Sequence, residues 1–138
     1  MDYKIVTFDP NTGLASIGIP AVQKILTGLD LLVQIVVLSF LRNPGKSVMF
    51  PAEGSGLRKD IGQYTYTLTG NEIQLLAVQR TRYVQQEVIS RQDPNQGTPY
   101  ERLQSLTLKN VAFDPTTSNT IMQVKLISEA GDSRDILV

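Results

Sequence analysis

The sequence predicts an α+β fold, in which a helical N-terminal part packs on a small C-terminal antiparallel β-sheet. Three patterns lead to this prediction. An apolar helical run occupies residues 30–42, a run of strong helix formers occupies residues 72–89, and alternating runs separated by turn residues fill residues 106–138. Because the main helices precede a meander of strands, segregated α+β packing is favoured over alternating βαβ units.

The length of 138 residues suits one domain with one core. Residues 1–28 are expected to form an N-terminal strand and extension, and residues 29–138 the α+β domain. Within the extension, residues 3–8 alternate as a short strand and residues 9–13 carry turn chemistry. Residues 14–27 are ambiguous, since a glycine and a proline interrupt the pattern.

The helix at residues 30–42 is predicted to stop at Asn43-Pro44-Gly45. Its apolar residues surround most of the helix, because one face carries Leu29, Leu32, Val33, Val36 and Phe40 while Ile35, Leu38 and Leu41 fall elsewhere. Such a helix must be covered on most sides. Two explanations are open: it is the central core helix of its own domain, or a partner protein buries its second face.

The segment after this helix is shaped by glycines and prolines. A proline-bounded loop is followed by Gly54-Ser55-Gly56, which opens a short helix at residues 57–61. Residues 64–69 are typical of a strand or of a linker into the next helix. None of these residues forms a recognisable catalytic set, so the segment indicates a protein that works by fitting against other proteins.

The long helix at residues 72–89 places Arg80 and Glu87 on its apolar face. They are interpreted as long side chains that reach the rim, with a buried ion pair or a partner contact as alternatives. The strands follow after a polar loop. We expect a strand to residue 113 with a bulge at Lys109-Asn110, and a second strand at residues 121–127. A last turn at residues 131–133 then leads into a terminal strand.

Composition argues against several function classes. The chain has 13 basic and 13 acidic residues and therefore no net charge, whereas a nucleic-acid binder normally has a basic excess. It has no Cys and no His, which removes the commonest metal ligands and the commonest general base. The apolar run at residues 29–41 is too short to cross a bilayer, and no signal peptide is visible. We expect a soluble, non-secreted protein that is not an enzyme, with no cofactor, nucleic acid or membrane partner.

Partial chemical motifs do not change this expectation. Gly45-Lys46-Ser47 lacks the earlier glycine and the strand–helix context of a phosphate-binding loop. Gly54 and Gly56 lack the third glycine of a dinucleotide fingerprint. The carboxylates of Glu53 and Asp60 are seven residues apart and give an alternative, a glycosidase acting on peptidoglycan.

The terminal segment, residues 120–138, is the better functional lead. A strand at the edge of a sheet presents unpaired N–H and C=O groups to which a partner strand can add. The alternative is a terminal hairpin that folds entirely on its own domain.

The order of these elements resembles the baseplate wedge proteins of contractile phage tails, including the sheath initiators and their relatives in the type VI secretion baseplate. The resemblance covers residues 29–138. It is carried by Leu41 with Asn43-Pro44-Gly45, where the family has a turn followed by glycine, and by Pro51 with Gly54-Ser55-Gly56-Leu57, which is similar to the family's Pro-x-x-Gly-Ser-x-Leu segment. Many members also carry Glu-Pro-Arg before the first C-terminal strand, and here Arg102 keeps the basic position.

The resemblance implies a structural protein of the virion that sits in the tail baseplate and assembles in the host cytoplasm. Its implied partners are baseplate wedge proteins, the tail sheath protein and the tail tube, with several copies in a sixfold assembly. The residues implied for wedge binding are Pro44, Gly45, Gly54, Gly56 and Arg102. Those implied for pairing with the first sheath ring are Met122, Val124, Leu126, Ile136, Leu137 and Val138. A tail or neck adaptor without sheath contact is a further alternative.

Overall fold

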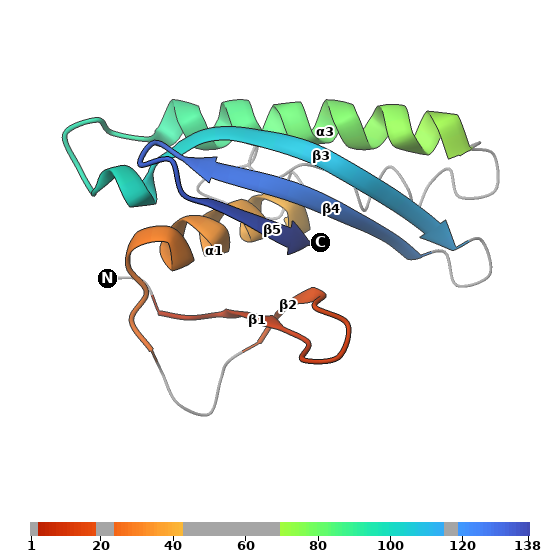
Figure 1. Ribbon diagram of the computed structural model, residues 1–138, viewed down its shortest axis with the longest axis horizontal. Coiled ribbons are helices and arrows are strands. Elements are labelled where there is room, and N and C mark those ends of the chain that lie inside the picture. Colours follow the sequence, from red (N-terminus) through yellow and green to blue (C-terminus); the bar gives the residue numbers. More distant parts are fainter. Residues whose placement is uncertain (1–2, 19–23, 43–69, 115–118) are drawn as a thin grey trace.

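The computed structural model describes residues 3–18, 24–42, 70–114 and 119–138. It confirms the α+β prediction, with helices ahead of a C-terminal antiparallel sheet (Figure 1). Several predictions lie outside the described residues. They are the wedge-binding Pro44, Gly45, Gly54 and Gly56, the glycosidase pair Glu53 and Asp60, the short helix at residues 57–61, and the strand or linker at residues 64–69.

The sheet consists of β3 (Leu103–Asp114), β4 (Asn119–Ser128) and β5 (Ser133–Leu137), in that spatial order. Both pairings are antiparallel. The register of β3 and β4 shifts between Leu108 and Asn110, which confirms the predicted bulge at the polar interruption of the strand. The turn into β5 contains Gly131 at φ +89°, a backbone conformation that favours glycine.

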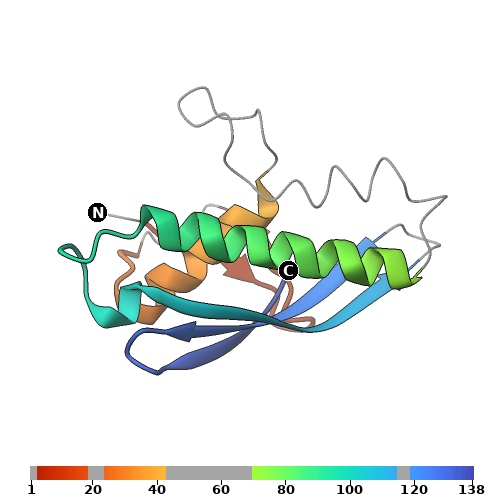
Figure 2. The ribbon, with the colours of Figure 1, turned by 90° about the horizontal axis from the view of Figure 1, so that it is seen from above.

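Two described helices cover one face of this sheet, α1 (Gly28–Leu41) and α3 (Gly70–Arg91). Figure 1 and Figure 2 together show α3 running along β3 and α1 crossing behind the sheet. Both helices match the predicted positions within two residues at each end. The short 3-10 helix η1 (Pro99–Glu101) follows α3 and packs against α1.

The core lies between the helices and the sheet. On β4 the alternate residues Met122, Val124 and Leu126 are each 0% exposed, while the residues between them face away. Each such side chain contributes about 1.5–3 kcal/mol through burial. The core side of α1 supplies Leu32, Val33, Val36, Val37 and Phe40, so α1 is a core helix, as one explanation expected.

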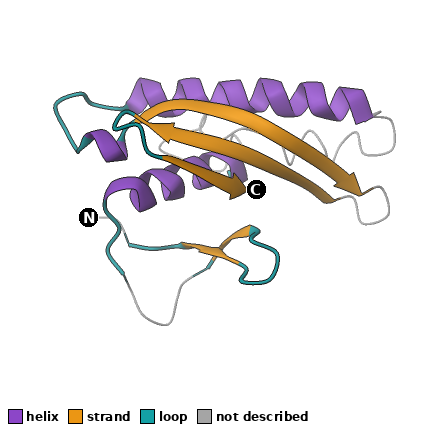
Figure 3. Cartoon of the chain, viewed as in Figure 1, coloured by secondary structure: helices purple, strands orange, loops and turns teal. Residues whose placement is uncertain are grey.

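The N-terminal extension forms a β-hairpin of β1 (Val6–Phe8) and β2 (Ala15–Ile17), seen beyond β5 and α1 in Figure 3. The first strand was predicted, although it is shorter than residues 3–8. The second lies in the ambiguous segment and has only three residues, too few for a periodic pattern to show. Val6 and Ala15 are buried in the same core as the helices, so the hairpin packs on the domain rather than standing apart.

Candidate functional site

Strand order decides which backbone groups a partner strand can reach. The central strand β4 pairs with β3 on one side and with β5 on the other. Met122, Val124 and Leu126 therefore have no open edge, and their side chains are buried. This corrects the expectation that these three residues accept a sheath strand, because a pattern of apolar residues cannot tell a central strand from an edge strand.

Only alternate residues of β5 direct their backbone N–H and C=O groups away from β4, toward the outer edge of the sheet. Val138 and Met122 exchange two backbone hydrogen bonds of 2.8 and 2.9 Å, and in an antiparallel ladder such pairs alternate with pairs that bond outward. The observed register then directs the N–H and C=O groups of Arg134 and Ile136 toward β4. Those of Ser133, Asp135 and Leu137 point to the outer edge.

The predicted sheath-binding set is corrected in a second respect. Ile136 and Val138 use their backbone groups on β4, and the Ile136 side chain is buried. Leu137 alone, among the six residues, presents its backbone to the outer edge. Ser133 was missed because it was assigned to the turn at residues 131–133, and Asp135 was not included in the sheath-binding set because that set was chosen from apolar residues of the strands.

The opposite edge of the sheet, along β3, is capped at Leu103 and Leu106 by the side chains of Gln92, which directly follows α3, and of Gln85 on α3. The Leu103 N–H donates to Gln92 Oε1, and Gln92 Nε2 donates to the Leu103 carbonyl at 3.2 Å. About two helical turns earlier, on α3, Gln85 Oε1 accepts from the Leu106 N–H at 2.9 Å. Covering an edge in this way satisfies backbone groups that would otherwise invite another strand.

The outer edge of β5 has much less cover. Within residues 3–18, 24–42, 70–114 and 119–138, Leu14 is the one residue whose backbone bridges to it, through an isolated parallel bridge with Leu137. Near the start of the strand, the Arg134 guanidinium forms an ion pair with Asp30 of α1. Both side chains are about half exposed, so this pair holds β5 to the helix with little energy.

Arg102 serves contacts within the chain. Its guanidinium forms an ion pair with Glu129 and donates weakly to the carbonyls of Pro94 and Gly97, at 3.4 and 3.5 Å. Its side chain is 18% exposed. The residue implied for wedge binding therefore ties the loop before η1 to the turn between β4 and β5, and a wedge contact through it stays a prediction.

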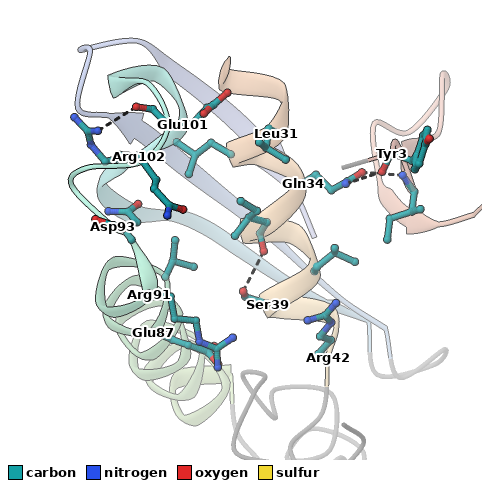
Figure 4. A pocket seen from close by; sticks show the side chains of 18 residues that line it. Tyr3, Leu31, Gln34, Ser39, Arg42, Glu87, Arg91, Asp93, Glu101 and Arg102 are labelled. Atoms are coloured by element: carbon teal, nitrogen blue, oxygen red, sulfur yellow. Dashed lines mark hydrogen bonds and ion pairs between the residues drawn. The ribbon is translucent and has the colours of Figure 1, made fainter. Parts of the chain in front are cut away.

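A groove of about 660 Å³ lies between α1, the end of α3 and the η1 loop (Figure 4). Its apolar lining includes Leu31, Ile35 and Leu38 of α1; Ile35 is exposed, whereas Leu38 also packs against the core. Beside the groove, the Glu87 side chain is 8% exposed and pairs with Arg91 at 3.1 Å, so for Glu87 the interpretation as a side chain that reaches the rim is wrong. That a partner protein covers this side of α1 stays a prediction.

Gln34 is a structural contact beside this groove that the sequence did not single out. It is 5% exposed, and its Oε1 accepts from the N–H groups of Ile5 and Val6 at 2.8 and 3.2 Å. Its Nε2 donates to the Tyr3 carbonyl at 2.9 Å, as Figure 4 shows. A single buried amide thus holds the strand that leads into the β1–β2 hairpin. A polar residue inside an otherwise apolar helix was the available signal.

The carboxylate of Asp9 has a pKa below its ordinary value of 3.8, because the backbone N–H groups of Thr12 and Asn11 hydrogen-bond the charged form. This is the hairpin turn, fully exposed, and the shift follows from turn formation rather than from catalysis. No cluster of three or more potential metal-ligating side chains occurs in the part of the chain that the structure describes. Nor do the helices described include one with the length and apolar character needed to cross a membrane.

Comparison of the chain with models of protein families, with curated proteins and with solved structures finds no match. Two features of the chain bear on its function: the geometry of the sheet edges and the resemblance in sequence order.

Proposed function

We propose that this protein is a structural component that accepts a β-strand of a partner on the outer edge of β5. In the assembly that the sequence resemblance implies, it is a baseplate protein of a contractile tail. It docks on the inner wedges in several copies, and the partner strand belongs to the first ring of tail sheath subunits.

The observation that carries the proposal is the difference between the two edges of the sheet. Gln85 and Gln92 cap the start of the β3 edge at Leu103 and Leu106, whereas the outward backbone groups of Ser133 and Asp135 on β5 have neither a strand nor a side-chain cap beside them among the described residues. An open edge of this kind supports docking through main-chain hydrogen bonds, with direction and register set by the ladder. Because every contact is made by backbone, the function needs no catalytic side chain.

Proline at Asp135 is the sharpest test of the proposal. Its backbone N–H points outward, so Asp135→Pro removes one donor from the outer edge and places a ring in the path of a partner strand. The bonds of Arg134 and Ile136 to β4 are kept. We expect the variant to fold and to lose sheath assembly, measured by counting sheathed particles in electron micrographs after complementation.

Asp135→Ala is the matched control, since it removes the same side chain and keeps the N–H. It should support normal sheath assembly. Proline at Val124 is a poor test, because Val124 is a buried residue of the central strand and its replacement would unfold the sheet. Normal sheath assembly on a folded Asp135→Pro protein would overturn the proposed function, as would a particle map in which β5 contacts no other chain.

A further inference from the structure

The β1–β2 hairpin lies where a partner strand would have to run. We propose that this hairpin is a gate on the β5 edge: it closes the edge at Leu137 and must lift before a partner strand can pair along the whole of β5. The inference rests on the proposed function, because it concerns the regulation of the same edge.

The contact that closes the edge is made by Gly13 and Leu14, the last residues of the loop before β2. Leu14 bridges to Leu137 in parallel, and a Cβ built on Gly13 would lie 3.4 Å from Leu137 Cδ1. Gly13 has φ +71°, so the tight turn needs glycine at the point that meets β5. The hairpin thus contacts β5 at Leu137, the last of the three β5 residues whose backbone groups point outward. It leaves Ser133 and Asp135 uncovered.

The hairpin has more contacts with α1 than with β5. On the α1 side, Gln34 holds the entering strand, and Val6 and Ala15 reach the core. On the β5 side, among the described residues, one isolated backbone bridge joins Leu14 to Leu137. A cavity of about 160 Å³ lies between β1, α1 and Arg134 of β5, so it leaves lining atoms without neighbours on both sides. The bridge to β5 is therefore the smaller of the two attachments.

Two strand-accepting states follow from this geometry. With the hairpin closed, a partner strand reaches only the stretch from Ser133 to Asp135, so it forms fewer hydrogen bonds and binds more weakly than on the whole edge. With Leu14 released from Leu137, the edge continues along β5. Partner affinity then depends on the fraction of molecules that are open, since only those are competent to bind.

A disulfide between hairpin and edge tests the gate. The natural chain has no cysteine, so Leu14→Cys with Leu137→Cys introduces one unambiguous pair. Bridged residues of neighbouring strands lie about 4.8 Å apart, within disulfide range. Thr7→Cys with Ser16→Cys is the matched control, because it staples β1 to β2 in the same hairpin without joining either to β5.

The readout is binding of the full-length protein to the purified sheath subunit, compared before and after reduction. We expect the oxidised Leu14–Leu137 pair to bind at least about tenfold more weakly, with recovery on reduction, and the control pair to bind equally in both states. Gln34→Ala, which loosens the attachment of the hairpin to α1, should bind more tightly than the natural chain.

Equal binding of the oxidised and reduced Leu14–Leu137 protein would overturn the gate. Failure of that pair to oxidise, while the control pair does, would also overturn it, because the two residues would then not meet in solution. Neither result would affect the proposed function, which is tested separately by Asp135→Pro and by the contacts of β5 in a particle map.

Discussion

Replacing Gln34 with alanine should detach the N-terminal hairpin from the domain. Its side chain is the shared partner of three backbone groups, the N–H groups of Ile5 and Val6 and the carbonyl of Tyr3. Alanine offers none of these bonds, and the helix itself is unharmed because alanine is the best helix former.

The size of the effect follows from the burial of each group. The bond to Val6 N–H is buried, and leaving a buried donor unpaired costs about 1–3 kcal/mol. The bonds to Ile5 N–H and to the Tyr3 carbonyl are partly buried, where water can replace the partner, so each contributes about 0.5–1 kcal/mol. The sum is about 2–5 kcal/mol, a large share of the 5–15 kcal/mol typical of a whole domain.

Two measurements distinguish local detachment of the hairpin from a loss of stability of the whole domain. Urea unfolding gives the change in the free energy of unfolding, and amide hydrogen exchange shows which backbone groups lose protection. We expect exchange to accelerate most at Ile5 and Val6, and less in β4. The control is Gln86→Ala, an exposed glutamine of α3, which should leave both measurements within about 0.5 kcal/mol of the natural chain.

Equal stability of Gln34→Ala and Gln86→Ala would refute this reasoning. So would a stability loss with unchanged exchange at Ile5 and Val6, because the effect would then arise elsewhere in the core.

Three further predictions concern other parts of the fold. Gln92→Ala should lower the free energy of unfolding by about 1–3 kcal/mol and increase self-association in sedimentation, since it uncovers the Leu103 backbone on the β3 edge; unchanged sedimentation would contradict the capping role. Gly131→Ala should lower the free energy of unfolding by about 1–2 kcal/mol in thermal unfolding, because alanine disfavours φ +89°. No atom lies within 4 Å of the new Cβ, so crowding does not contribute. Gly70 is equally uncrowded but has no positive φ, so Gly70→Ala should be neutral or stabilising. The pKa of Asp9 is lowered in the folded state, so its stabilising contribution is present above about pH 3.8 and is lost as pH falls through the folded pKa. An NMR titration of Asp9 should find a midpoint below 3.8. Asp9→Asn should flatten this part of the acid unfolding curve.

The sequence predicted well those elements that depend on residues close together in the chain. The helices α1 and α3 follow from apolar periodicity and helix-forming residues over more than ten positions each. The bulge in β3 follows from a polar interruption at Lys109-Asn110, and the last turn from Gly131. The second hairpin strand was missed, because three residues beside a glycine give no period to detect.

The candidate site was predicted less well, since neighbours in space define it. The sequence located strand pairing in the last nineteen residues, but it chose apolar positions such as Met122 and Val124, which the fold buries in a central strand. It did not find Gln34, Gln85 or Gln92, because a glutamine that caps distant backbone groups has the same local pattern as one on the surface.

The sequence by itself determined the helices α1 and α3, the strands of the C-terminal sheet, the α+β class and the lack of Cys and His chemistry, since each depends on residue type and short-range spacing. Only the tertiary structure decided that β4 is central, that Gln85 and Gln92 cap the start of the β3 edge and that the hairpin meets β5 at Leu137. The physical reason is that a backbone hydrogen-bonding group is satisfied or exposed according to which distant segment lies beside it, and strand order, not composition, sets that neighbour.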